Sequence, residues 1–273
     1  MDDNRCEADA TTMPTPIPAA YLLDLDGTLY TGAAAIPGAA ETLTRLRSRG
    51  KPFRLVTNTT SRSRRMLVDR LGGYGLVVSP EEIITATLAG VELIRSGGYA
   101  RVAPFVPDGG LEDMDGLTLC GGTSGRPRET ADAVVLGDLG DRWTFALLQE
   151  AFEQLMGGAV LVALSRDRYF RQGERLALDA GPFVAALEYA SGSTAAVAGK
   201  PSPGFFAAAV RSLGLAADRS VAMVGDDLWS DVQGAQRAGL QGWLVRTGKF
   251  REDVLEASGI APDRVLGSIA DLS

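Results

Sequence analysis

Two aspartates, Asp24 and Asp26, directly follow the short apolar run Tyr21-Leu22-Leu23 and precede Gly27. Residues i and i+2 of an extended chain point to the same side, so both carboxylates would emerge together where a buried strand ends. Like charges this close need a cation or a shared proton. A surface turn closed by Asp-Gly is the simpler interpretation. The buried strand before the pair favours a chemical role.

Two further polar groups follow predicted strands. Thr57 and Asn58 come after the strand 53–56 and before a helix, where a hydroxyl, an amide and free backbone N–H groups can hold an anion. Helix N-capping would explain them equally well. Lys200 stands before Pro201, near the start of a helix. It could neutralise a phosphoryl oxygen or a carboxylate nucleophile, or be an ordinary surface lysine.

A second acidic group, Asp226, Asp227 and Asp231, follows the strand predicted over 220–224. Mg²⁺ prefers oxygen ligands and keeps several waters, so one or two carboxylates and a substrate phosphate suffice to bind it. Capping of a helix by aspartate would explain any one of these residues alone. The chemical hypothesis rests on the order along the chain: an acid pair, a hydroxyl, a lysine and an acidic cluster, each near the end of a successive strand.

The chain contains no histidine, which excludes Ser-His-Asp and Cys-His catalysis and every His-ligated metal site. Cys6 and Cys120 lie far apart and form no disulfide or metal framework. No Gly-x-x-x-x-Gly-Lys-Ser/Thr loop follows a strand, which argues against a kinase or nucleotide-binding protein, and Gly121 to Gly125 is expected to be a plain turn. Catalysis must therefore rest on carboxylates, hydroxyls, amides, lysine or arginine, together with a hard cation.

Strands and helices alternate at both ends of the chain, which predicts an α/β fold with a Rossmann-like, doubly wound parallel sheet. Between the two ends lies a segment with its own strands and helices, long enough for a small α/β domain. We interpret it as a cap inserted into the core; one continuous sheet is the alternative. The predicted division is a flexible leader at 1–17, a core made of 18–86 and 192–273, and a cap at 87–191.

The net charge of −7 disfavours a nucleic-acid partner, because binding a phosphate backbone requires a basic face. The acidic N-terminus has no apolar core typical of a signal peptide. No run approaches the roughly 18 apolar residues of a membrane span. We therefore expect a cytoplasmic protein with no membrane partner.

Four segments in this order resemble the motifs of the haloacid dehalogenase superfamily, in its phosphatase branch. They are DLDGTLY (24–30), VTNTTSR (56–62), GKPSP (199–203) and GDDLWSD (225–231). The long insertion resembles the type-II cap of NagD-like and p-nitrophenylphosphatase-like proteins. The segment VTNTTSR, the stretch from 166 to 190 and GKPSPGFF (199–206) are similar to phospholysine phosphohistidine inorganic pyrophosphate phosphatase-like proteins.

The resemblance implies a role for each motif residue. Asp24 would be the nucleophile and a Mg²⁺ ligand, and Asp26 the general acid and then base, with its main-chain carbonyl on Mg²⁺. Thr57, Asn58 and Lys200 would hold the phosphoryl group, and Asp226 would bind Mg²⁺. Asp227 and Asp231 would support the metal site without binding the ion directly. The substrate would be a small phosphorylated metabolite.

The cap would close over the site and contact the leaving group, and type-II caps also imply a homodimer formed through the cap. Candidate leaving-group contacts are Arg166, Asp167, Arg168 and Tyr169, although a polar loop at a strand end explains them equally well. A pyrophosphate or phosphorus–nitrogen bond hydrolase is a close variant. A non-catalytic, regulatory phospholigand-binding protein is the alternative from another class. The presence of both Asp24 and Asp26 favours the enzyme.

Overall fold

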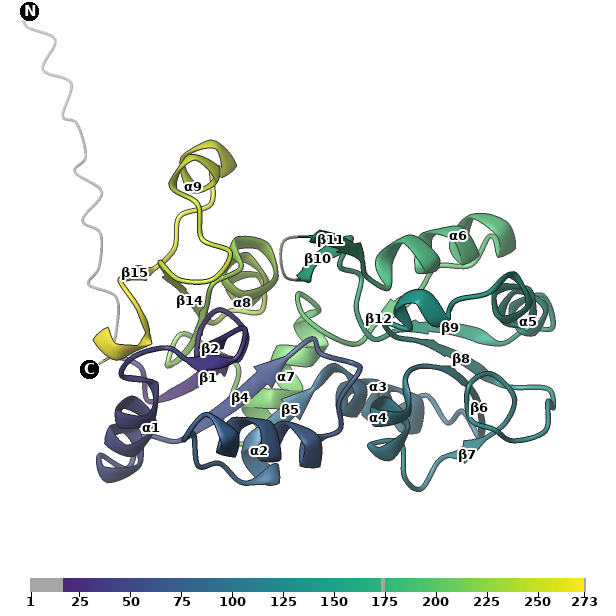
Figure 1. Ribbon diagram of the computed structural model, residues 1–273, viewed down its shortest axis with the longest axis horizontal. Coiled ribbons are helices and arrows are strands. Elements are labelled where there is room, and N and C mark those ends of the chain that lie inside the picture. The colour runs from purple at the N-terminus through teal and green to yellow at the C-terminus, as the bar shows by residue number, and fades with distance from the viewer. Residues whose placement is uncertain (1–16, 173–174, 273) are drawn as a thin grey trace, which may run out of the picture.

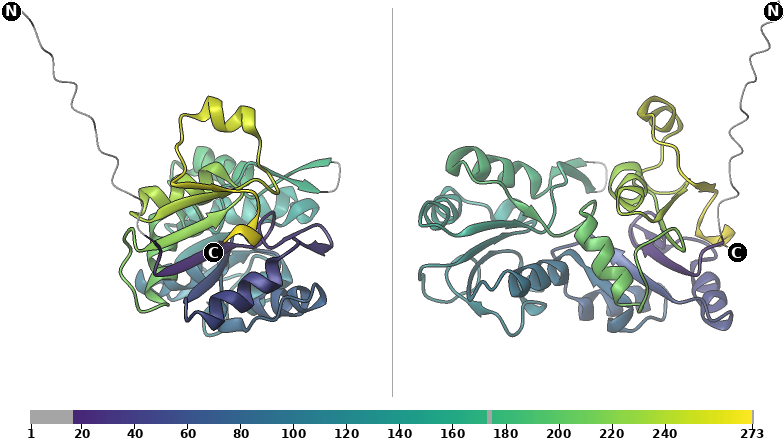
Figure 2. Two further views of the ribbon diagram at one scale, coloured as in Figure 1. Left: turned by 90° about the vertical axis from the view of Figure 1, so that its left-hand side faces the viewer. Right: turned by 180° about the vertical axis from the view of Figure 1, so that it is seen from behind.

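The computed structural model describes residues 17–172 and 175–272 of the chain (Figure 1). The predicted leader at 1–17, apart from its last residue, and Cys6 lie outside the described residues. The described chain forms two parallel sheets that lie side by side along the long axis of the molecule (Figures 1 and 2). Within this part of the chain, no helix is both long enough and apolar enough to cross a membrane.

The larger sheet has six parallel strands in the order β15-β14-β13-β1-β4-β5. Its strands are β1 (Ala20–Asp24), β4 (Phe53–Thr57), β5 (Ile83–Thr85), β13 (Val221–Gly225), β14 (Gln241–Val245) and β15 (Arg264–Leu266). The chain builds outward from β1 in one direction and returns to the other side of β1 with β13. Such a reversal of strand order opens a crevice at the carboxyl ends of the two strands, where ligands bind in α/β sheets.

Helices cover both faces of this sheet, so β1 is buried on both sides and reads as a continuous apolar run. Tyr21 and Leu23 pack with α1 (Ala39–Ser48) and α2 (Arg64–Gly73). The alternate residues of β1 pack on the other face against helices near the C-terminus. These are α7 (Pro203–Arg211) and α8 (Gly234–Arg237).

The smaller sheet has five parallel strands in the order β12-β9-β8-β6-β7. They are β6 (Arg101–Phe105), β7 (Thr118–Leu119), β8 (Ala133–Leu136), β9 (Val160–Ala163) and β12 (Ala196–Val197). One face packs against α3 (Ala86–Ser96), with α4 (Asp108–Glu112) nearby, and the other against α5 (Phe145–Met156) and α6 (Gly181–Ser191). The alternative of one continuous sheet is therefore wrong.

The smaller sheet, called the second sheet below, includes residues further along the chain than the sequence predicted. The segment from 192 onward was assigned to the core, yet Ala196 and Val197 pair with Val162 and Ala163 of β9. A strand of only two residues carries no periodic signal that could have placed it. The return to the core therefore follows Val197 rather than Ser191.

The remaining elements are short. They are the hairpins β2 (Tyr30–Thr31) to β3 (Ala34–Ala35) and β10 (Tyr169–Gln172) to β11 (Arg175–Leu178), helix α9 (Glu252–Ser258), the 3₁₀ turns η1 (Pro80–Glu82), η2 (Gly140–Arg142) and η4 (Ile269–Asp271), and the π-helix η3 (Leu228–Gln233). The π-helix η3 is followed directly by α8. π-helical turns are rare and are often found at functional sites.

Candidate active site

Three strand ends of the larger sheet meet at the reversal of strand order. Asp24 is the last residue of β1, Thr57 is the last residue of β4, and Asp226 directly follows β13. All three are buried, with exposed fractions of 7% or less. The predicted chemistry therefore converges in space at the edge where α/β sheets bind their ligands.

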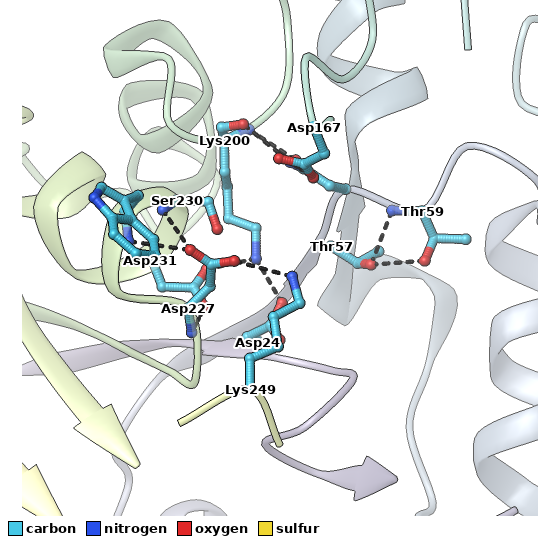
Figure 3. A network of polar contacts seen from close by, with 11 residues as sticks. Asp24, Thr57, Thr59, Asp167, Lys200, Asp227, Ser230, Asp231 and Lys249 are labelled. Atoms are coloured by element: carbon cyan, nitrogen blue, oxygen red, sulfur yellow. Dashed lines mark hydrogen bonds and ion pairs between the residues drawn. The ribbon is translucent and has the colours of Figure 1, made fainter. Parts of the chain in front are cut away.

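Lys200 lies at the centre of this group (Figure 3). Its Nζ donates to Asp24 Oδ1 at 2.5 Å and to Asp231 Oδ1 at 2.6 Å, and its side chain is 4% exposed. Burial alone would lower the pKa of Lys200, but the two carboxylates outweigh burial and raise it. Lys200 is therefore a fixed cation that orients the Asp24 carboxylate, and the interpretation as a surface lysine is wrong.

The carboxylates of Asp24, Asp226 and Asp231 form a buried cluster in which one oxygen of each lies within 4.8 Å of one oxygen of the other two. The Lys200 ammonium bonds to two of these three carboxyl groups, and the positive charge of Lys249 also favours the ionised forms of Asp24 and Asp226. Burial, reinforced by Asp24 and Asp231, raises the pKa of Asp226 well above its usual range. A divalent cation would relieve this excess of negative charge, and an all-oxygen donor set suits a hard ion such as Mg²⁺.

Two glycines allow the backbone to pack directly onto Asp226. Gly27 and Gly248 have φ values of +83° and +61°, and a Cβ on either would overlap Asp226 Oδ2. The N–H of Lys249 also donates to this oxygen at 2.7 Å. The Asp226 carboxylate is therefore held in place by the loop that follows β14 and by the turn of the first motif.

Asp227 caps η3 and stands outside the carboxylate cluster. One of its oxygens accepts from the N–H groups of Trp229 and Ser230, both at 3.0 Å, and the other contacts Lys249 Nζ at 2.9 Å. Burial would raise the pKa of Asp227, but Lys249 and these donors lower it to about 2. Asp227 is therefore an anion that organises the loops around the site.

Thr57 and Asn58 differ in what they can offer a substrate. Thr57 Oγ1 accepts from the Thr59 N–H at 3.1 Å and donates to Thr59 Oγ1 at 3.0 Å. The Asn58 carboxamide is bonded to the backbone of Lys200, so the predicted phosphate contact by this side chain is replaced by a structural one. Capping does not explain either residue, because Ser63 caps α2.

Comparison with known proteins places the chain in a family. Residues 21–120 match the family model described as haloacid dehalogenase-like hydrolase, and residues 197–272 match one described as HAD-hydrolase-like. The human haloacid dehalogenase-like hydrolase domain-containing protein 2 is 41% identical over 234 residues, 85% of each chain. The chain belongs to the haloacid dehalogenase-like hydrolases.

Two further relatives of this hydrolase carry phosphatase names. The human phospholysine phosphohistidine inorganic pyrophosphate phosphatase is 34% identical over 256 residues, which cover 92% of this chain and 91% of the relative. The p-nitrophenyl phosphatase of Archaeoglobus fulgidus superposes with a TM-score of 0.84 at 30% identity, covering 94% of this chain and 98% of the other. The expected superfamily, the α/β fold and the assignment to phosphatase enzymes are confirmed.

The second aspartate of the hydrolase's first motif, Asp26, is exposed and does not join the carboxylate cluster. Surrounding protein atoms partly desolvate this carboxyl and raise its pKa, against the attraction of Arg70 and Lys249. A carboxyl group with a raised pKa that faces solvent is suited to giving and taking protons.

The predicted leaving-group contacts fall into two kinds. Arg166 is exposed and pairs with Glu188 at 2.5 Å, and Arg168 and Tyr169 are exposed as well. Asp167 instead points at the second motif, where Asn58 Nδ2 donates to its Oδ2 at 3.2 Å (Figure 3). Among these four candidates, Asp167 therefore hydrogen-bonds directly to a residue of the second motif.

Sequence reasoning missed Gly248 and Lys249, which shape the site around Asp226 and Asp227. Both lie in the loop that follows β14. Polar or glycine residues just past a parallel strand end reach the ligand edge of the sheet. The position of Gly248 and Lys249 just past a parallel strand was therefore the sequence signal that could have identified them.

Proposed function

We propose that this hydrolase is a Mg²⁺-dependent phosphatase that cleaves a small phosphorylated metabolite through an aspartyl-phosphate on Asp24. The observation that carries the proposal is the buried Lys200 ammonium, which joins Asp24 and Asp231. An ion pair of this kind fixes the direction of the Asp24 carboxylate. It also places a positive charge where an anionic phosphoryl group would arrive.

In the first half of the proposed reaction, an Asp24 carboxylate oxygen attacks phosphorus and the bond to the leaving oxygen breaks. Asp26 gives its proton to that oxygen, so the product leaves as a neutral hydroxyl compound. A carboxylate is a weak base but an adequate nucleophile when it is aligned and partly desolvated. Lys200 Nζ and the Thr57 hydroxyl hold the phosphoryl oxygens during this transfer.

In the second half, Asp26 takes a proton from a water molecule whose oxygen attacks phosphorus. The bond between phosphorus and Asp24 breaks, inorganic phosphate leaves and the Asp24 carboxylate is restored. Asp24, Asp226 and the main-chain carbonyl of Asp26 would hold Mg²⁺, with Asp231 beside them. When bound, Mg²⁺ supplies charge neutralisation that lets two anions approach each other.

The second sheet supports a role as the cap of this phosphatase, because its loops contact the second motif. Residues 87–197 would then form the cap that selects the substrate, and a homodimer would use it. The relative named for phospholysine, phosphohistidine and inorganic pyrophosphate makes these the first alternative substrates to test.

The test is turnover of p-nitrophenyl phosphate by wild type and by Asp24→Asn. We expect the variant to lose more than about a thousandfold in kcat while remaining folded, because asparagine cannot act as the nucleophile. Asp69→Asn, an exposed aspartate on α2, is the matched control and should keep wild-type activity. Retained turnover in Asp24→Asn would remove Asp24 as the nucleophile.

A further inference from the structure

The second sheet reaches the phosphatase centre through Asp167, in the loop after β9. Its carboxylate accepts a hydrogen bond from Asn58 Nδ2 at 3.2 Å, and Asn58 directly follows Thr57 at the end of β4 (Figure 3). This contact spans 109 positions of the chain and joins the two sheets at the site. Asp167 was expected to meet a leaving group, so its orientation toward Asn58 requires another explanation.

The carboxamide of Asn58 hydrogen-bonds to both the N–H and the carbonyl oxygen of Lys200. Its Oδ1 accepts from the Lys200 N–H at 2.8 Å, and its Nδ2 donates to the Lys200 carbonyl oxygen at 2.9 Å. These two hydrogen bonds fix the Lys200 backbone and therefore the position from which its side chain extends. The Nζ at the far end of that side chain lies between Asp24 and Asp231.

The fit around this carboxamide leaves no room for adjustment. A Cβ at Gly199 would lie 2.6 Å from Asn58 Oδ1 and would also overlap the Leu164 carbonyl oxygen. The Gly199 N–H donates to that same carbonyl at 3.1 Å. The segment GKPSP (199–203) therefore needs glycine at its first position, because the chain after β9 and the Asn58 amide both pack against it.

Asp167 is itself held firmly. Its N–H donates to the Oγ of the buried Ser165 at 3.1 Å, and its carbonyl oxygen accepts from the Gly181 N–H at 2.9 Å. A Cβ at Gly181 would lie 2.5 Å from the Asp167 carbonyl oxygen. The loop after β9 and the first turn of α6 thus aim the carboxylate at Asn58.

We propose that Asp167 is a positioning residue that orients Lys200 through Asn58. A carboxamide grips the Lys200 backbone in one orientation only, because the flipped group would set donor against donor and acceptor against acceptor. An ionised carboxylate only accepts hydrogen bonds, so Asp167 holds the Nδ2 side of Asn58 in the working orientation. The second sheet thereby sets the geometry of the lysine that holds Asp24. The proposal rests on the phosphatase function proposed above.

The first test compares Asp167→Ala with Asp167→Asn. Alanine removes the acceptor, and we expect kcat to fall about tenfold with little change in KM, because the misplaced group acts in the chemical step. Asparagine keeps an oxygen acceptor and should retain kcat within about threefold. Equal losses in the two variants would overturn the proposal, because charge rather than the hydrogen bond would then matter. Asp167→Leu replaces Asp167→Ala if the latter unfolds.

The second test measures whether Asp167 acts through Asn58. Asn58→Ala should lower kcat more than Asp167→Ala, and adding Asp167→Ala to it should cost less than about twofold further. Fully additive losses would contradict a shared pathway. Asp141→Asn, an exposed aspartate on η2, is the control for the second sheet.

The third test separates positioning from contact with the leaving group. The kcat ratio of Asp167→Ala to wild type is measured with p-nitrophenyl phosphate and with acetyl phosphate, which have unlike leaving groups. A positioning role predicts the same ratio for both, and a ratio that differs more than about fivefold indicates a leaving-group contact instead. A wild type that hydrolyses neither substrate, with Asp24→Asn indistinguishable from it, counts against the proposed function. An active wild type with failing Asp167 variants counts against this inference alone.

Discussion

The two parallel sheets carry acidic residues on edges that face each other, yet the edges are built differently. On the larger sheet, Asp24 and Asp231 are buried against Lys200, and Asp226 is enclosed by backbone. Beside the second sheet, Asp138 lies shortly after β8 and Asp179 directly follows the hairpin strand β11. Each accepts a hydrogen bond from an N–H group two or one positions further along the chain. Both sheets have parallel strands, so topology alone does not determine which edge is catalytic. Burial and the pairing of carboxylates with Lys200 distinguish the edge of the larger sheet.

Asp179 and Asp138 show the consequence for charge. Burial raises the pKa of Asp179 to about 7, and the nearby carboxylates of Asp167 and Asp138 add to the shift. At the edge of the larger sheet, the pKa of Asp226 is raised too. There, however, three carboxylates lie close enough together to bind a divalent cation. The contrast predicts that a metal distinguishes the two edges.

Metal addition and removal should have the largest effect. Chelation of divalent cations should silence turnover, and Mg²⁺ at about one hundred times its Kd should stabilise the fold by about 2.7 kcal/mol, measured by thermal unfolding. Asp226→Asn should lose this stabilisation because it removes a carboxylate of the buried cluster. Asp138→Asn, on the facing edge, should keep it. Equal losses in the two variants would erase the distinction between the edges.

The enclosure of Asp226 by glycine provides the next prediction. Gly248→Ala should lower kcat about a hundredfold, because the new methyl group displaces a site carboxylate. Gly32 has the same φ of +61°, and among the described residues no atom lies within 4 Å of a Cβ placed there, so Gly32→Ala introduces the backbone strain without the clash. It should cost about 1 kcal/mol of stability, by urea unfolding, and leave kcat unchanged. A similar fall in kcat in both variants would attribute the effect to the backbone.

Much of the larger sheet was predictable because its signals are strong. The buried strand before Asp24 and the alternation of strands with amphipathic helices predicted the fold class and the edge that collects Asp24, Thr57 and Asp226. The second sheet was expected too, as part of an inserted segment with its own strands and helices. Long apolar runs with clear ends suffice for this level of detail.

Side-chain direction and short elements were beyond reach of the sequence. Spacing placed Asn58 at the site but could not show that its amide faces Lys200 rather than a phosphate. Asp231 was expected behind the metal, yet the turn of η3 brings its oxygen into the cluster. Both outcomes depend on three-dimensional packing, which no pattern of residue types encodes.

The smallest predicted effect concerns Asp179, after the hairpin strand β11, and the pH dependence of stability. The raised pKa of Asp179, about 7 in the folded chain against 3.8 as its ordinary value, means that the folded state binds the proton more tightly. Its contribution to stability is therefore complete below about pH 4 and is lost as the pH rises through about 7. Lys249 is the nearby cation that opposes the shift, whereas Asp167 and Asp138 enlarge it.

Asp179→Asn mimics the protonated form, so it should match wild type near pH 4 and exceed it by about 1–2 kcal/mol near pH 8, allowing for solvent screening. Urea unfolding at pH 4, 6 and 8, read as the difference from wild type, measures this effect because the other titrating groups cancel. Asp141→Asn, at an exposed aspartate in the turn η2, should show no such difference. Parallel curves for wild type and Asp179→Asn would mean that Asp179 is ionised in the folded protein, and that the second edge tolerates its charges as well as the first.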